Sequence, residues 1–193
     1  DVVIVAAKTD PKAGARGMTL FTMNCDSPGF RRGKNLEKMG LNSGDTSEMS
    51  FEDVRLPVAK VLGGEGEGFA NLMNELPRER LILGVGCVGA ADGILEQTVS
   101  YVSERQAFGE HLSRLQNTRF ELAEVKTDLE LNRALMEKCI DKYIDGSLST
   151  EEASMVKLAS SEMQGKVVDR CLQLFGGYGY MKEYPIARAY VDA

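Results

Sequence analysis

The stretch at residues 63–83, GGEGEGFANLMNELPRERLIL, contains the change in hydrophobic spacing that decides the fold class. Four glycines among its first six residues indicate a flexible junction. Before the junction, apolar residues occur in short β-branched or alternating runs. After it they recur every three or four residues, as they do on one face of a helix. The sequence therefore predicts an α+β protein, with a β region at residues 1–64 followed by a helical region at residues 65–193.

The β region contains three candidate strands. Val2–Ala7 and Met18–Met23 are apolar runs separated by a loop rich in Gly, Pro and Lys. Ser47–Val54 alternates between apolar and polar residues, and Pro57 excludes a continuing central strand. We expect these residues to form part of an antiparallel β domain.

The helical region contains three long amphipathic segments and a short one. The first begins near Phe69 and includes Pro77, which predicts a kink or an irregular turn. Ser149 and Glu152 have the capping-box spacing that starts the third. The residues that bound the helices are Gly109, Gly146, Gly176, Gly177 and Pro185. Long helices joined by short links predict an antiparallel bundle of the four-helix type.

Composition excludes several classes of protein. The 193 residues carry a net charge of −6, which argues against non-specific binding of nucleic acid. His111 is the only histidine, so a multi-histidine metal site is impossible, and no metal is expected. The four cysteines lack metal or redox-pair spacing and are expected to be buried thiols. No apolar run suggests a membrane span. The chain starts inside a strand-like run and stops inside a helical one, which suggests a piece of a larger protein.

Gly84, Gly86 and Gly89 spell the G-x-G-x-x-G pattern of dinucleotide-binding folds. That pattern needs a strand before it and a βαβ unit around it, and here the surrounding residues have helical spacing. We therefore expect these glycines to permit close contact between helices instead.

Glu75, Arg78, Glu79 and Arg80 form a charge cluster. Such a run is usually a solvated helix face. However, Glu79 lies just before the apolar residues 81–83, where partial desolvation would raise the pKa of its carboxyl group. A base that takes a proton from carbon needs a raised pKa. Residue types alone leave both interpretations open.

Two further segments have the residues of an anion site. ERQAFG at 104–109 places Arg105 at a helix end, where it either caps the helix dipole or clamps a phosphate. QLFGGYGY at 173–180 has consecutive glycines, whose backbone N–H groups can approach an anion closely. The alternative for the second segment is a turn packed by its two tyrosines.

Taken in order, these segments resemble the acyl-CoA dehydrogenase family. The matching stretches are KMG at 38–40, SFEDVRLP at 50–57, ERQAFG at 104–109, QLFGG at 173–177 and EYP at 183–185. Two more, ELPRERL at 75–81 and YPIARAYVDA at 184–193, resemble its long-chain branch. The resemblance implies that residues 1–64 are the latter part of that family's middle β domain. It also implies that residues 65–193 are most of its C-terminal helical domain, truncated at the end.

The resemblance also implies a chemistry, the FAD-dependent α,β-dehydrogenation of long-chain acyl-CoA thioesters in fatty-acid β-oxidation. Glu79 matches the catalytic base of the long-chain branch, and Arg78 and Arg80 match residues that border the acyl-CoA. The implied FAD contacts are Arg105, Phe108, Gln116, Gln173, Gly176 and Gly177. Some of these act across a subunit interface in the family, so a homo-oligomer is expected, either a dimer or a tetramer.

The implied electron acceptor is an electron-transfer flavoprotein, in the bacterial cytoplasm or the mitochondrial matrix. Two other functions stay open at this stage. One is an acyl-CoA oxidase, which passes electrons to oxygen. The other is a non-catalytic helical oligomerisation module, because the chain lacks parts of the implied site and need not be active alone.

Overall fold

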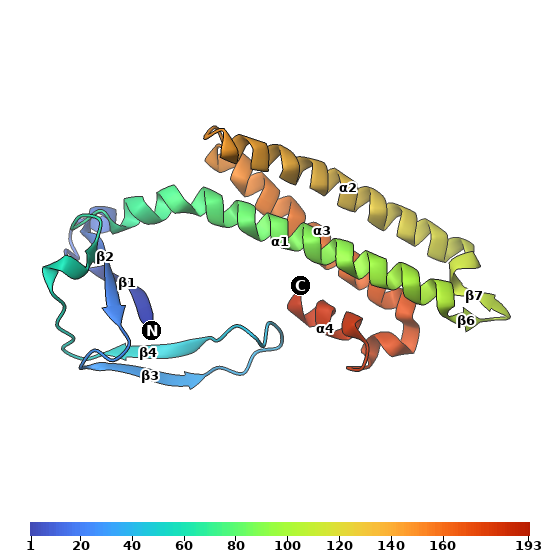
Figure 1. Ribbon diagram of the computed structural model, residues 1–193, viewed down its shortest axis with the longest axis horizontal. Helices are drawn as coiled ribbons and strands as arrows, with labels where there is room; N and C mark the ends of the chain where they lie inside the picture. The colour runs from blue at the N-terminus through green and yellow to red at the C-terminus, as the bar shows by residue number, and fades with distance from the viewer. The chain divides into compact units, whose positions relative to one another are not determined.

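The computed structural model describes all 193 residues, which form two compact units. The first comprises residues 1–38 and 42–76, and the second comprises residues 39–41 and 77–193. The helix α1 (Gly68–Glu104) runs through the division between residues 76 and 77 (Figure 1). The domain boundary expected at residues 64/65 lies shortly before this helix begins and stays a prediction.

The first unit contains a three-stranded antiparallel sheet in the order β1-β2-β5, of which Figure 1 labels β1 and β2. Its strands are β1 (Val2–Lys8), β2 (Met18–Asn24) and β5 (Val61–Leu62). The two long strands are the two apolar runs of the sequence, and the central strand buries Leu20 and Met23. Two residues are too few for a periodic signal, so β5 was not predicted.

A second, two-stranded sheet pairs β3 (Phe30–Asn35) with β4 (Ser47–Phe51). The rings of Phe30 and Phe51 lie 5.3 Å apart across the pair. The sequence did not predict β3, because FRRGKN has one apolar residue and therefore no alternation. The predicted strand at residues 47–54 ends early, and Asp53 has a φ of 50°, a left-handed conformation that a strand does not adopt.

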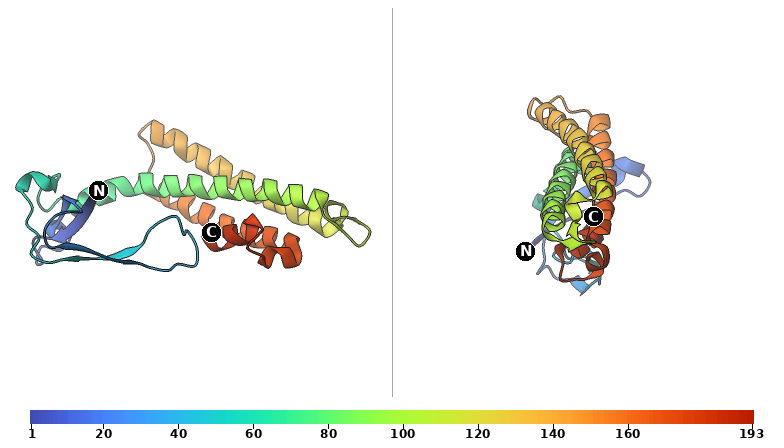
Figure 2. Two further views of the ribbon diagram at one scale, coloured as in Figure 1. Left: turned by 60° about the horizontal axis from the view of Figure 1, so that its bottom comes forward. Right: turned by 90° about the vertical axis from the view of Figure 1, so that its right-hand side faces the viewer.

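The second unit is an antiparallel helical bundle made from α1, α2 (Gln116–Ile144), α3 (Thr150–Phe175) and α4 (Pro185–Asp192) (Figure 2). The apolar stripes of the three long helices meet in one core, and α4 lies along α3. The most deeply buried core residues are Ala91, Leu129, Val156, Val168 and Cys171. This architecture confirms the predicted α+β fold class.

The ends of the helices follow local sequence chemistry. Ser149 and Glu152 form the predicted capping box: the Ser149 hydroxyl accepts from the Glu152 N–H at 3.1 Å, and the Glu152 carboxylate accepts from the Ser149 N–H at 3.3 Å. Pro185 occupies the first turn of α4. The irregular turn expected as one alternative at Pro77 does not occur, because α1 continues through this residue; the other alternative, a kink, stays a prediction. A proline removes one backbone hydrogen bond, and the helix extends for several turns on either side.

Residues 39–41 belong to the helical unit because they pack on α4. A Cβ on Gly40 would lie 1.8 Å from the carbonyl oxygen of Val191, so only glycine fits there. The Leu41 N–H donates to Asp192 Oδ1 at 2.6 Å. Packing on the last helix thus explains the glycine of the KMG stretch.

One helix, α1, is long and apolar enough by composition to span a membrane, with a mean hydropathy of 1.2 over 18 residues. The core helix of a bundle has the same profile, and α1 places Val88, Ala91 and Leu95 in the bundle core. Its composition is therefore weak evidence for a span.

Candidate functional site

Glu79 lies on α1 between two arginines and is largely open to solvent. Its side chain is 58% exposed, and its carboxylate is 3.4 Å from the Arg78 guanidinium. Ile82 and Leu83 are themselves 55% and 45% exposed, whereas Leu81 turns into the core. Of the two interpretations left open by the sequence, the chain by itself therefore favours the solvated helix face, because a helix turns neighbouring residues toward different sides. A low-dielectric environment for Glu79 requires another group to cover this face.

The Arg80 side chain points toward α3, unlike the side chains of Arg78 and Glu79. Its guanidinium is half-buried and donates to Ser154 Oγ at 3.2 Å. The Ser154 hydroxyl in turn donates to the Thr150 carbonyl at 2.7 Å. The sequence contained no signal for Ser154, because a single serine within a helical stripe is unremarkable in type and spacing. The structure thus anchors Arg80 on the bundle and leaves Arg78 and Glu79 outside it.

The six residues expected to contact FAD gather at one end of the bundle. In an antiparallel bundle the end of α1, the start of α2 and the end of α3 lie together, as Figure 1 shows. All six are exposed; they are Arg105, Phe108, Gln116, Gln173, Gly176 and Gly177. Sequence positions as far apart as 105 and 177 thus come to one surface.

A short hairpin at this end connects α1 to α2. It pairs β6 (Gln106–Ala107) with β7 (Glu110–His111) around a two-residue turn. The turn residues Phe108 and Gly109 have φ values of 57° and 86°, as tight hairpin turns require. A left-handed phenylalanine is unusual, and here it holds a ring that is 93% exposed. The hairpin therefore presents an aromatic face outward.

The glycine turn follows α3 as the short helical segment η4 (Gly176–Tyr180). Gly176 has φ 57° and ψ −135°, a conformation that glycine alone adopts without strain. Gly177 has no positive φ, and a Cβ there would meet nothing within 4 Å. Packing within this chain therefore does not explain glycine at 177, and the backbone there is open to a close-approaching ligand.

The alternative interpretation of this turn, in which two tyrosines pack it, is right for one of them. Tyr178 stacks on Tyr184 with ring centroids 4.9 Å apart, whereas Tyr180 is 90% exposed. The Arg105 guanidinium lies over the Tyr178 ring, 5.0 Å from its centroid. The structure thus joins the two segments in which the sequence indicated an anion site.

A guanidinium, a glycine turn with open space where side chains would stand, and an exposed aromatic ring suit a pyrophosphate attached to a flat ring system. These residues therefore fit part of an FAD molecule. The structure holds no group of three or more His, Cys, Asp or Glu side chains arranged to bind a metal ion.

The proposed base and the cofactor contacts do not converge within the chain. From Glu79 to Glu104 the helix rises 1.5 Å per residue, so about 38 Å separates them along α1. The expected site residues therefore fall into two groups, one on α1 around Glu79 and one beyond the C-terminal end of α1.

The G-x-G-x-x-G pattern lies wholly inside α1, with no strand before it, which excludes the dinucleotide-fold interpretation. A Cβ on Gly84 would lie 3.4 Å from Val156 Cγ2, so Gly84 does permit close contact with α3. Gly86 and Gly89 meet nothing within 4 Å of an added Cβ. The expectation of close helix contact was therefore right for Gly84 alone.

Known proteins resemble this chain in both sequence and structure. Residues 66–193 match the family profile described as the acyl-CoA dehydrogenase C-terminal domain. The mitochondrial long-chain specific acyl-CoA dehydrogenase of Rattus norvegicus is 45% identical over 195 residues, which cover 100% of this chain and 45% of that protein. The crystal structure of an acyl-CoA dehydrogenase from Geobacillus kaustophilus superposes with a TM-score of 0.97 at 42% identity, covering 100% of this chain and 51% of that one.

A subunit of the caffeyl-CoA reductase–Etf complex of Acetobacterium woodii is 36% identical over 192 residues, which cover 100% of this chain and 51% of that protein. The chain thus spans about half the length of the curated relatives it matches. With its helical unit matched by the family profile, the chain belongs to the acyl-CoA dehydrogenase family.

Proposed function

We propose that this chain, as part of a complete acyl-CoA dehydrogenase, carries out the FAD-dependent α,β-dehydrogenation of long-chain acyl-CoA thioesters. In this proposal residues 1–64 belong to the middle β domain and residues 65–193 to the C-terminal helical domain. The observation that carries the proposal is the meeting of Arg105 with the open glycine turn at one end of a bundle from this family.

Glu79 is the proposed base. The α C–H bond of the thioester breaks, its proton goes to the Glu79 carboxylate, and its electron pair forms the new C=C bond as the β-hydrogen leaves with its own pair. A thioester α-proton is far less acidic than a carboxylic acid, so the base must be shielded from water while it acts. Because Glu79 is exposed in this chain, the acyl-CoA and the remaining parts of the enzyme must cover it. Bound FAD supplies the acceptor for the β-hydrogen.

The two flanking arginines are the proposed substrate contacts. Arg78 is 3.4 Å from the Glu79 carboxylate, so it would border the acyl-CoA beside the base. Arg80 is fixed on α3 through Ser154, so its charge has a defined position.

The cofactor contacts are proposed at the other end of α1. Arg105 would pair with the pyrophosphate, and the backbone at Gly176 and Gly177, which no Cβ shields, would approach it closely. The other proposed contacts are Phe108, Gln116 and Gln173. Because about 38 Å of helix separates Glu79 from this end, one chain must serve two cofactor sites. We therefore propose a homo-oligomer, either a dimer or a tetramer, in which each FAD contacts two chains.

The proposed electron acceptor is an electron-transfer flavoprotein, supported by the relative that is a subunit of an Etf complex. The long-chain preference rests on the 45% identity with the rat enzyme. The matched proteins are mitochondrial and bacterial, which supports the mitochondrial matrix or the bacterial cytoplasm as the location.

The test is Glu79→Gln in the complete enzyme, with Glu96→Gln, another exposed residue of α1, as the matched control. The glutamine keeps the size of the side chain and removes its basicity, so turnover should fall by about 10²–10⁴-fold. The flavin absorption bands should remain, and acyl-CoA should no longer bleach them under anaerobic conditions. Retained turnover would show that another base acts. A purified complete protein without flavin bands would instead favour the oligomerisation module.

A further inference from the structure

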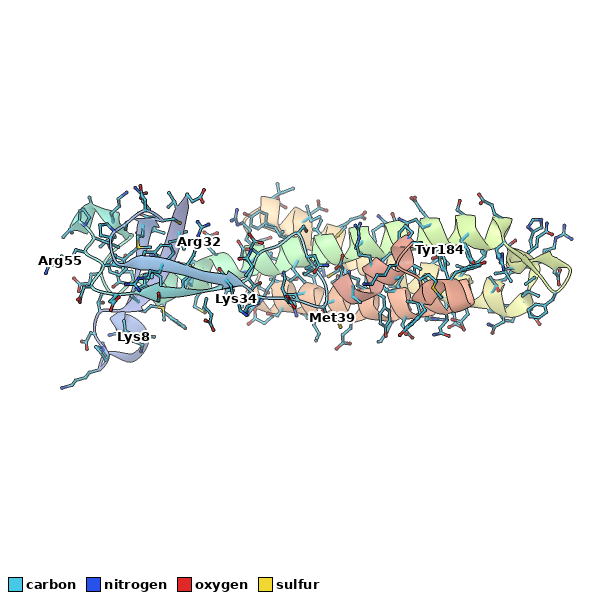
Figure 3. All side chains as sticks on the ribbon, turned by 90° about the horizontal axis from the view of Figure 1, so that it is seen from below. Lys8, Arg32, Lys34, Met39, Arg55 and Tyr184 are labelled. Atoms are coloured by element: carbon cyan, nitrogen blue, oxygen red, sulfur yellow. The ribbon has the colours of Figure 1, made fainter.

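Tyr178 belongs to a cluster of four aromatic rings that ties the end of the bundle together. Tyr101 stacks on Phe175 at 4.0 Å between centroids, and Tyr178 stacks on Tyr184 at 4.9 Å. The rings of Tyr101 and Phe175 each meet Tyr184 edge-on at 6.1 Å. Figure 3 shows Tyr184 at the start of α4, beside α1. Because the cluster joins α1, α3, η4 and α4, one face of the Tyr178 ring rests on a fixed support.

The other partner of the Tyr178 ring is Arg105, whose guanidinium lies 5.0 Å from its centroid. Among the arginines of the bundle, Arg78, Arg133 and Arg170 form ion pairs, and Arg105 takes part in none of them. Its positive charge is therefore held in place by a ring face and is not neutralised by a carboxylate.

Such a contact orients the guanidinium of an arginine without using its N–H groups. An arginine side chain has substantial rotamer freedom, which binding a ligand must restrict. A cation over a ring is attracted to the π face, while its N–H edges stay available for two parallel hydrogen bonds to a phosphate. Gly176 and Gly177, in the same turn as Tyr178, leave open backbone beside it.

We infer that Tyr178 is a positioning residue whose ring, seated on Tyr184, holds the Arg105 guanidinium ready for the pyrophosphate of FAD. This inference rests on the proposed function, because it takes FAD as the ligand of Arg105. It predicts that Tyr178 contributes to FAD affinity through Arg105 and not by packing alone.

The experiment measures the dissociation constant of FAD from the complete enzyme by the recovery of flavin fluorescence. Tyr178→Leu removes the ring and should weaken binding about threefold to thirtyfold, whereas Tyr178→Phe keeps the ring and should bind as tightly as the wild type. Tyr180→Leu is the matched control, from the same turn but 90% exposed, and should change nothing. If Tyr178→Leu does not fold, Tyr178→Met replaces it, since it also lacks a ring but fills similar space.

A double-mutant cycle separates positioning from packing. In the Arg105→Gln background, Tyr178→Leu should cause no further loss of FAD affinity. An equal loss in both backgrounds would overturn the inference, because the ring would then act by packing alone. An unchanged affinity of Tyr178→Leu in the wild-type background would overturn it as well. In either case, an enzyme that binds FAD and loses turnover in Glu79→Gln would leave the proposed function standing.

Discussion

The glycines inside α1 offer a sharp test of how the helix packs. In a helix interior, replacing glycine with alanine gains about 0.8–1.0 kcal/mol, because glycine loses more backbone freedom on folding. At Gly89 an added Cβ meets nothing within 4 Å, so Gly89→Ala should gain that full amount. At Gly84 the Cβ would lie 3.4 Å from Val156 Cγ2 and 3.6 Å from Ser160 Oγ, which leaves room for one methyl group and no more.

Valine at the same two positions separates packing from propensity. Gly84→Val places two further methyl groups against α3, and such overpacking costs about 1–3 kcal/mol. Gly89→Val changes the helix propensity by the same amount, but its side chain meets no neighbour. Valine is a slightly better helix former than glycine, so this variant should not lose stability. The difference between the two valine variants should therefore be about 2 kcal/mol in the free energy of unfolding.

The measurement is urea unfolding of the chain followed by far-ultraviolet circular dichroism, with m values compared between variants. A thermal melt gives a second reading, since 1 kcal/mol shifts the Tm by about 2–4 °C in a chain of this size. Equal stability of Gly84→Val and Gly89→Val would refute the close contact between α1 and α3. Destabilisation by Gly89→Ala would refute the open face of α1, because something would then have to pack on it.

Three other expectations concern helix capping, pH and cysteine reactivity. Ser149→Ala should lower the free energy of unfolding by about 1 kcal/mol in the same urea titration, and no change would contradict the capping box. The Lys142 side chain and the Ser149 backbone N–H lower the pKa of Glu152. The stabilisation of the fold by ionised Glu152 is thus complete above the ordinary carboxyl pKa, and it is lost as the pH falls through the lowered pKa. Urea unfolding at a series of pH values should show a smaller loss of stability in Glu152→Gln. A thiol reagent should modify half-buried Cys25 first, as peptide mass spectrometry can show, because burial raises the thiol pKa of the other three, Cys87, Cys139 and Cys171.

The long helices were predictable because their signals are local and repeated. The stripe that includes Val156, Met163 and Val167 recurs at helical spacing, and Ser149 with Glu152 marks its start. The strands β3, β5, β6 and β7 have no such repetition, because they are short or polar and form through pairing with another segment, which for β6 and β7 lies just across a two-residue turn. Tertiary pairing, unlike periodicity, leaves little trace in a segment of two to six residues.

The candidate site was predictable in its residue types and only partly in its environment. The gathering of Arg105 with the glycine turn follows from an antiparallel bundle, which the spacing predicted. The exposure of Glu79 did not follow, because apolar neighbours in sequence cover a side chain only if they share its face of the helix. The contact of Tyr178 with Arg105 joins residues 73 positions apart, and no local pattern encodes such a distance.

The single helix α1 explains why the two proposed groups of site residues lie far apart on one chain. It begins in one compact unit and continues through the bundle, so Glu79 and the end that bears Arg105 have a fixed separation of about 38 Å along one axis. The Glu79 side chain is 58% exposed, and Arg105 takes part in none of the ion pairs of the bundle. In the proposed function, burial of Glu79 and pairing of Arg105 with an anion would both come from outside the bundle. Assembly would then make the base effective and complete the cofactor contacts at once, which ties the proposed chemistry to the association of chains.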